Sequence, residues 1–288
     1  MNSRHNGREA QPARGTRLLR VGCAFTYRAE VPTPAVFMVR PDRRDQVRLS
    51  GENLFTEPDV LVRDHVDVYG NWSSRLVLPP GLSTVNYAAW VDVPDRVEDV
   101  DETAPERWPD DLPGEVLLYT LPSRYCVSDV LADEAWSRFG AHPPGYRRVQ
   151  AICRHVHESL EFGYGTSTAL STAADVNASG LGVCRDFTHL AISFCRALNI
   201  PARYVFGYLP DLDVSPDGAP MDFAAWMEVW LGDRWWTFDP RNSVQRKGRV
   251  VVGRGRDAAD VAMVTTFGGP VLESMVVQAE EDMAPAWR

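Results

Sequence analysis

Residues 182–208 read GVCRDFTHLAISFCRALNIPARYVFGY and predict a helix followed by a buried strand. Apolar side chains recur at three- and four-residue spacing from Phe187 to Leu198, which is typical of a helix with one buried face. Cys184 therefore lies at the N-terminal end of this helix. The first N–H groups of a helix are unpaired within it and carry partial positive charge, so they favour a thiolate and can bind the oxyanion of an attacked carbonyl. Cys184 is thus a candidate nucleophile, with an expected pKa below that of an ordinary cysteine.

A predicted hairpin follows this segment. The strand over 202–208 leads through a loop rich in Asp, Pro and Gly to strands over 223–231 and 235–238, which are joined at Gly232-Asp233. A two-residue turn would place Trp226 opposite Asp239 and residue 224 opposite Arg241, all on one face of the sheet. Residue 224 would then be a diagonal neighbour of Asp239, and a histidine there could be oriented by the carboxylate. Residue 224 is alanine, and no histidine occurs downstream of His189.

The rest of the chain predicts an α+β protein in two parts. Residues 1–16 are expected to be a disordered leader, and 17–94 an N-terminal antiparallel β domain because short apolar runs alternate with Pro, Gly and Asn turn signals. The acidic, proline-containing stretch 95–113 reads as a linker. The core is assigned to 114–288, with helices over 128–139 and 146–160 ahead of the Cys184 helix.

The pattern of a cysteine on a helix followed by two strands resembles the bacterial branch of the transglutaminase-like superfamily of papain-type thiol enzymes. The resemblance spans about residues 17 to 270. It rests on the GVCRDF block and on four further segments: Asp67-Val68-Tyr69-Gly70-Asn71, Leu121-Pro122-Ser123-Arg124-Tyr125-Cys126, Met221-Asp222-Phe223, and Trp235-Trp236-Thr237-Phe238-Asp239. The resemblance assigns the nucleophile to Cys184, the histidine to position 224 and the aspartate to Asp239. The departure from the family pattern, Ala224, thus falls on the catalytic base.

The resemblance implies a β-sandwich-like N-terminal domain in front of a papain-like, transglutaminase-like core. It also implies acyl transfer through a Cys184 thioester: amide hydrolysis, transamidation, or amide formation in a biosynthetic pathway. The expected substrates are peptides, amides or acyl thioesters, bound by Trp226, Asp222 and Tyr164, and no cofactor is required. Asp222 is a poor base for a thiol because the pKa of an unperturbed carboxyl is about 4.

Ala224 has two competing explanations. In the first, the chain is an inactivated or trapping variant of an active enzyme, since one alanine stands among otherwise intact motif residues. In the second, it is a natural pseudoenzyme that binds a peptide or carrier-tethered acyl group without turnover. A structural β-domain adaptor is a third class, but an adaptor would not need the cysteine block.

Composition excludes several other classes of protein. A net charge of −9 and a pI near 5.2 argue against a nucleic-acid partner or an anionic membrane surface. The first 20 residues lack the apolar segment of a secretory signal, so a cytoplasmic location is expected.

The five cysteines include no C-x-x-C pair and are expected to be free thiols. His155 and His157 lie on different helix faces and predict no metal site, and the oligomeric state stays open.

Overall fold

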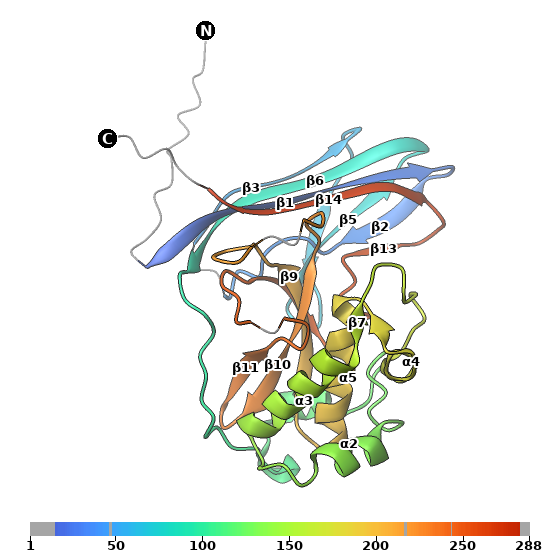
Figure 1. Ribbon diagram of the computed structural model, residues 1–288. Coiled ribbons are helices and arrows are strands. Elements are labelled where there is room, and N and C mark those ends of the chain that lie inside the picture. Colours follow the sequence, from blue (N-terminus) through green and yellow to red (C-terminus); the bar gives the residue numbers. More distant parts are fainter. Residues whose placement is uncertain (1–14, 46–47, 216–217, 243, 283–288) are drawn as a thin grey trace.

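The structure is a computed structural model that describes residues 15–45, 48–215, 218–242 and 244–282. Within these ranges it confirms an α+β protein, with a β-rich unit stacked on a core of helices and sheet (Figure 1). The predicted leader over 1–16 falls almost entirely outside the described residues, and the first strand begins at Thr16.

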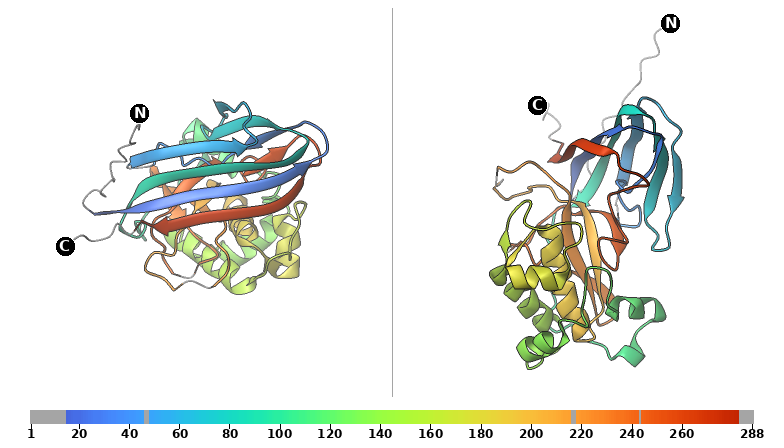
Figure 2. Two further views of the ribbon diagram at one scale, coloured as in Figure 1. Left: turned by 90° about the horizontal axis from the view of Figure 1, so that it is seen from above. Right: turned by 90° about the vertical axis from the view of Figure 1, so that its right-hand side faces the viewer.

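The β-rich unit contains two four-stranded antiparallel sheets, in the orders β14-β1-β6-β3 and β13-β2-β5-β4. Their strands are β1 (Thr16–Ala29), β2 (Thr33–Phe37), β3 (Arg48–Glu57), β4 (Arg63–Val66), β5 (Trp72–Leu78), β6 (Gly81–Pro94), β13 (Val264–Thr266) and β14 (Val271–Glu281). The two long strands β1 and β6 pair along their whole length, from Thr16 opposite Pro94 to Ala29 opposite Gly81. Seen from above, β3, β6, β1 and β14 form a continuous cover over the core (Figure 2).

The last segment of the chain lies in the β unit and not in the core, where it was expected. The assignment of 114–288 to the core is wrong for its last segment, because β13 pairs with β2 and β14 pairs with β1 in the N-terminal unit. Val277 and Ala279 on β14 are buried in this unit. The β unit is therefore closed by a segment that lies more than 240 residues after its first strand, with Leu19 opposite Glu281.

The core places the Cys184 helix on an antiparallel sheet of order β11-β10-β9-β12. Its strands are β9 (Ala202–Tyr208), β10 (Ala224–Leu231), β11 (Arg234–Phe238) and β12 (Val250–Gly255), and its longer helices are α2 (Ala132–Phe139), α3 (Tyr146–Ser159) and α5 (Cys184–Ala197). Shorter elements complete it: η1 (Pro109–Asp111), α1 (Gly114–Leu117), η2 (Leu118–Thr120), α4 (Ala173–Ser179), β7 (Glu161–Phe162) and β8 (Leu181–Gly182). The apolar face of α5 packs on β9, β10, α2, α3 and α4. The helix and the strands predicted from 182–238 are thus confirmed to within one residue at each strand end.

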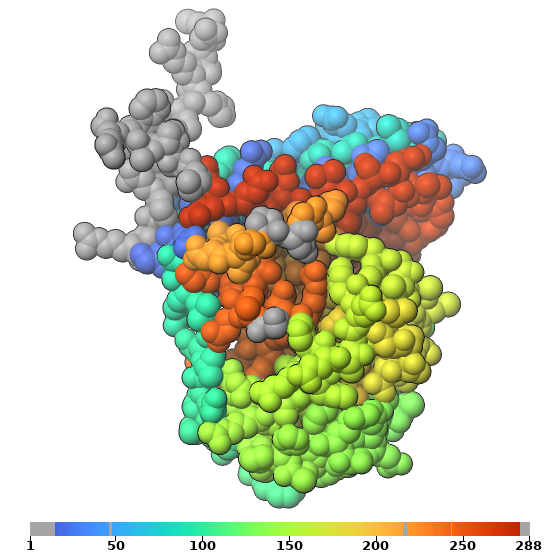
Figure 3. Space-filling view, in the orientation of Figure 1, coloured from blue at the N-terminus to red at the C-terminus, as the bar shows by residue number. Residues whose placement is uncertain are grey.

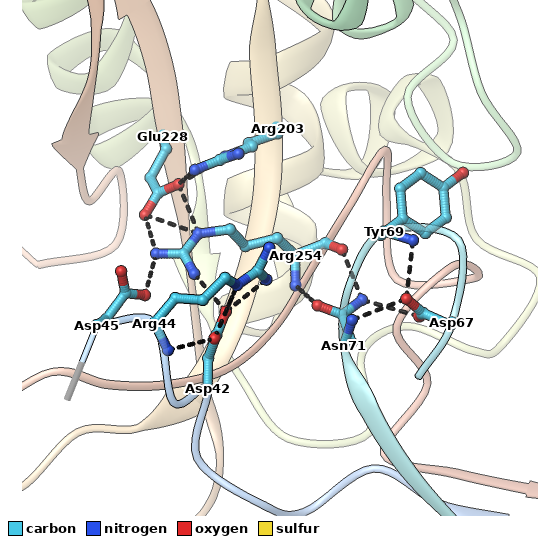
Figure 4. Close-up of polar contacts among 9 residues, drawn as sticks. All are labelled: Asp42, Arg44, Asp45, Asp67, Tyr69, Asn71, Arg203, Glu228 and Arg254. Carbon is cyan, nitrogen blue, oxygen red and sulfur yellow. Dashed lines mark hydrogen bonds and ion pairs between the residues drawn. The ribbon is translucent and has the colours of Figure 1, made fainter. Parts of the chain in front are cut away.

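A buried polar network joins the two units at Arg254 on β12 (Figure 4). Its guanidinium donates to Glu228 on β10 and to Asp42 from the β unit, at 2.9 and 2.8 Å, and it also pairs with Asp45. The backbone of Arg254 is bound by Asn71, whose amide donates to its carbonyl at 2.8 Å and accepts from its N–H at 2.9 Å. Unpaired buried charges are costly, so this paired network fixes the β unit against the edge of the core sheet.

Every helix within the described ranges is too short or too polar to cross a lipid bilayer.

Candidate thiol site

Cys184 is the first residue of α5, as the sequence predicts. The helix start is held by Asp186, whose carboxylate accepts from the Val183 N–H at 2.9 Å and from the Ser167 hydroxyl. The preceding Gly182 is required by this close approach, because a Cβ there would lie 2.9 Å from the Cβ of Asp186. The same carboxylate therefore caps the helix that carries the thiol and ties it to the segment before α4.

Cys184 lines a cavity of about 560 Å³. The described residues of its wall come from the connection between α3 and α4, the start of α5, β9 and β10 with the loop between them, the loop after β11, and the segment from β12 into β13, together with Tyr125 ahead of α2. In Figure 3 the connection before α4 (yellow-green) and the loops around β10 and β11 (orange) face each other across this recess. The thiol is therefore accessible from a hollow large enough for an acyl group and part of a peptide.

The surroundings of the thiol oppose ionisation. Burial raises the pKa of Cys184 to about 11, and Asp222 adds to this increase. The Arg241 guanidinium and the backbone N–H groups of Ala225 and Arg185 lower the pKa, but they offset burial only in part. The expectation of a pKa below that of an ordinary cysteine is therefore wrong for this structure. The N–H of Arg185 at the helix terminus does lie beside the sulfur, but desolvation is the larger effect.

Ala224 lies beside Cys184 in the same cavity. The sulfur of Cys184 donates to the carbonyl of Phe223 at 3.9 Å, and Ala224 lines the wall directly after that residue. Its side chain is buried, and it pairs with Gly207 of β9. None of the histidines within the described ranges lines the cavity. The position that the resemblance gives to the base thus lines the cavity of the thiol and carries only a methyl group.

Asp239 does not line this cavity. The β10–β11 register is as predicted from Leu231 opposite Arg234 to Met227 opposite Phe238, where strand pairing ends. Asp239 follows directly with a largely buried side chain, and its carboxylate accepts from the N–H groups of Arg241 and Asn242, from the Asn242 amide and from the Arg249 guanidinium. Burial opposes ionisation, but Arg249 and Asn242 hold the pKa of Asp239 below its usual range. The carboxylate of Asp239 is thus fully engaged without any imidazole.

Of the three residues expected to bind substrate, two line the cavity and one lies outside it. Tyr164 and Asp222 line the cavity, and burial raises the pKa of Asp222 above its usual value. Trp226 lies outside the cavity, almost fully buried on the face of β10 turned away from α5, with the Arg249 guanidinium 5.0 Å from its ring centroid. Two of the three residues therefore lie where a substrate could contact them.

Two further residues of the wall escaped the sequence analysis as site residues. Arg241 lies in the loop after β11, and its guanidinium stacks over the ring of Phe162 at 4.1 Å. The sequence did contain a signal for Arg241, because the predicted hairpin register places it opposite residue 224. Phe162 follows α3 in a two-residue strand and carries no motif that could have identified it.

His189 lies on the same helix as Cys184 but does not line the cavity. Its ring is buried between Tyr125 and Tyr204, and its Nε2 accepts from the Ala258 N–H at 3.1 Å. Burial lowers the pKa of His189 to about 3. It therefore remains neutral as part of the core. In the described part of the chain, His, Cys, Asp and Glu side chains form no group of three that could hold a metal ion.

Comparison with known proteins gives consistent matches. The family model of the transglutaminase-like superfamily matches residues 135–240, which include Cys184, Ala224 and Asp239. A crystal structure from Cytophaga hutchinsonii, described as that of a candidate cysteine protease, is 31% identical with a TM-score of 0.83, and the match covers 95% of this chain and 94% of that one.

Two mycobacterial relatives match over shorter ranges. An uncharacterized protein of Mycobacterium leprae is 32% identical over 144 residues, which are 49% of this chain and 51% of that protein. An uncharacterized protein of Mycobacterium tuberculosis is 28% identical over 217 residues, which are 72% of this chain and 66% of that protein. The chain thus spans between about half and two thirds of the length of these relatives.

Proposed function

The chain belongs to the transglutaminase-like superfamily, whose fold supports thiol-based acyl transfer or proteolysis, and we propose that Cys184 is its acyl-accepting thiol with turnover impaired by Ala224. In the proposed step the sulfur bonds to the acyl carbon of a peptide, amide or thioester. The bond to the leaving amine or thiol breaks, and the thiol proton passes to the leaving group through solvent. Hydrolysis or aminolysis of the thioester would complete the cycle.

The observation that carries this proposal is the placement of Cys184. Its sulfur lies at a helix N-terminus, beside the N–H groups of Ala225 and Arg185, and lines a cavity of about 560 Å³. Such N–H groups can bind the oxyanion that forms when a thiolate attacks a carbonyl. A buried structural cysteine would need neither the cavity nor these donors.

Impaired turnover follows from the residues that line the cavity beside the thiol. A base must lie within hydrogen-bond reach of the proton it removes, and Ala224 offers none. Asp222 is the carboxylate in the cavity whose charge acts on Cys184, and its raised pKa makes it a stronger base than an ordinary carboxyl. An ordinary carboxyl has a pKa of about 4 and the thiol one of about 11, so a carboxylate in this place supports slow proton transfer only.

A second candidate function is retention of an acyl group or peptide without turnover. The bonding of Asp239 favours it, because all four of its contacts come from Arg241, Asn242 and Arg249 and none is left waiting for an imidazole. A site that keeps its cavity and cysteine but commits its aspartate elsewhere is suited to binding.

Covalent capture tests the proposed function. We expect incubation with activated acyl thioesters and with glutamine peptides to leave one acyl group on the protein, mapped by mass spectrometry to Cys184. The adduct should be long-lived, because position 224 carries no histidine to activate water for its removal. The matched control is Cys195→Ala, which removes a buried thiol of the same helix. Acylation of another cysteine, or unchanged labelling in Cys184→Ala, would show that Cys184 is not the acceptor.

A further inference from the structure

Three arginines and two aspartates are among the described residues that line the Cys184 cavity. Arg246 donates to Asp211 at 2.6 Å, and Arg185 pairs with Asp186 at 3.2 Å. Within the described ranges Arg241 has no carboxylate at ion-pair distance, and its guanidinium contacts the face of Phe162. Arg241 is thus a cation of the cavity wall without an ion-pair partner among the described side chains, although its charge acts on Asp222 across the cavity.

The position of Arg241 is fixed by the backbone. Its N–H donates to the Asp239 carboxylate at 3.0 Å, and its carbonyl contacts Nδ1 of His157 at 2.9 Å. The stacked Phe162 ring restricts the guanidinium from one side. A guanidinium held in this way loses little freedom on binding, which favours recognition of a planar anion.

Arg241 is also close to the reacting sulfur. Among the groups that lower the pKa of Cys184, Arg241 has the largest effect, and it lowers the pKa of Asp222 as well. Both residues line the same cavity, so the guanidinium and the thiol border one shared space. An acyl group bonded to Cys184 would lie in that space.

We propose that Arg241 binds a carboxylate of the acyl donor, so that the site selects donors with an acidic group close to the attacked carbonyl. The inference rests on the proposed function and names its substrate class. A guanidinium pairs with a carboxylate through two parallel N–H···O bonds and stays charged at every physiological pH. Asp222 disfavours a second negative charge on its own side of the cavity, which directs the carboxylate towards Arg241.

Competition between iodoacetate and iodoacetamide tests this inference. The two reagents have similar size and differ in charge, and in both cases the sulfur bonds to the methylene carbon and iodide leaves. Both alkylation rates are proportional to the ionised fraction of Cys184, so this fraction cancels in their ratio. The ratio therefore reports the local preference for a carboxylate. We expect the iodoacetate:iodoacetamide ratio to fall by about tenfold in Arg241→Gln, the loss typical of one charge-assisted hydrogen-bonded pair. Arg241→Lys should keep part of the preference.

Arg246→Gln is the matched control, because it removes one positive charge from the same cavity but from a guanidinium that Asp211 already pairs. We expect its ratio to stay within about twofold of the unmodified chain, as for a change at a paired group. An equal fall in Arg246→Gln, or no fall in Arg241→Gln, would overturn the role of Arg241 while leaving Cys184 as the nucleophile. Failure of both reagents to label Cys184 would overturn the proposed function as well. Far-ultraviolet circular dichroism establishes that each variant is folded.

An acyl donor extends the same comparison to the proposed reaction. Succinyl thioesters carry a free carboxylate, and the corresponding succinamyl thioesters carry a neutral amide of nearly the same shape. Capture of the succinyl group at Cys184 should be faster than capture of the succinamyl group by about tenfold, and the difference should disappear in Arg241→Gln. Equal rates in the unmodified chain would contradict the inference.

Discussion

Cys184 shares its cavity with a cation but with no histidine base. In thiol enzymes a histidine usually supplies both functions, because its protonated ring stabilises the thiolate and its neutral ring accepts the proton. Here Arg241 supplies positive charge, yet an arginine cannot be deprotonated in a protein and so cannot accept a proton. The site therefore keeps part of the stabilisation of the thiolate. At position 224 it lacks a group that could accept the thiol proton.

The raised pKa of Cys184 leads to a prediction for its pH profile. With a pKa of about 11, roughly a thousandth of the thiol is ionised at pH 8. Alkylation of Cys184 by iodoacetamide should therefore rise about tenfold per pH unit from pH 7 to pH 10 without a plateau. Quenched time courses read by mass spectrometry give this rate, and a plateau below pH 8 would show that the thiolate is far better stabilised than the structure indicates.

The order of labelling provides the control for that experiment. Burial raises the pKa of Cys23 and Cys126 to about 12 and the pKa of Cys153 well above its ordinary value. Cys184 should therefore react first among the five cysteines. Earlier labelling of Cys126 or Cys153 would exclude Cys184 as the nucleophile.

Among the secondary-structure elements, the β10–β11 hairpin shows how far the sequence predicts the site. The turn at Gly232-Asp233 and the pairing up to Met227 opposite Phe238 follow from turn chemistry and the two-residue period of strands. Beyond Phe238 the ladder ends, because Asp239 binds the following N–H groups in a tight turn before Pro240 can extend the strand. The partner of Asp239 could not be predicted, since Arg249 lies ten residues away across a loop without regular pattern.

The ion pair of Arg249 with Asp239 should make a large contribution to stability. Both side chains are buried, and removal of one member of a buried pair typically costs about 3–5 kcal/mol. Arg249→Gln should therefore lower the free energy of unfolding in urea by about this amount at pH 7. The exposed pair of Arg147 with Glu102 is the control, and Arg147→Gln should change stability by less than about 0.5 kcal/mol.

The stability lost in Arg249→Gln should be smaller at low pH than at pH 7. The folded pKa of Asp239 is held below its unfolded value, so the stabilisation by Arg249 is fully present above the unfolded pKa near 4. It disappears as the pH falls through the lower, folded pKa. The difference between the unmodified chain and Arg249→Gln should thus shrink below about pH 4, and a difference that stays constant down to pH 2.5 would contradict this explanation.

At the level of the whole molecule, the α+β organisation could be predicted but the path of the chain could not. Local periodicity identifies the N-terminal strands and the Cys184 helix, because these patterns depend on nearby residues. The return of β14 to β1 depends on pairing between residues more than 240 positions apart, for which a single sequence carries no local signal. The junction at Arg254 was hidden for the same reason, although the Asp67 to Asn71 segment that binds it was recognised as a motif.

This chain path also explains how the cavity is held. Asn71 of the β unit fixes the end of β12, and the loop from β12 to β13 forms part of the cavity wall before the chain re-enters the β unit. The β unit therefore acts as a support for one wall of the thiol site. In the proposed acyl transfer, its described residues position the wall and take no direct part in the chemistry.

Turnover by Ala224→His is the measurement that most directly tests whether this molecule is a thiol acyl-transfer site without its base. Position 224 lines the cavity that contains Cys184, and a base that reaches the thiol typically contributes roughly 10²–10⁴-fold in rate. We expect a gain near the lower limit, because Asp239 already accepts bonds from Arg249 and Asn242 and orients the ring weakly. The assay follows hydrolysis and amine incorporation on glutamine peptides, simple amides and thioesters, and the gain should vanish in Ala224→His/Cys184→Ala and fall in Ala224→His/Asp239→Asn. A folded Ala224→His variant with no Cys184-dependent turnover and no acyl-enzyme on any of these substrates would contradict the proposed acyl transfer and leave the binding function in its place.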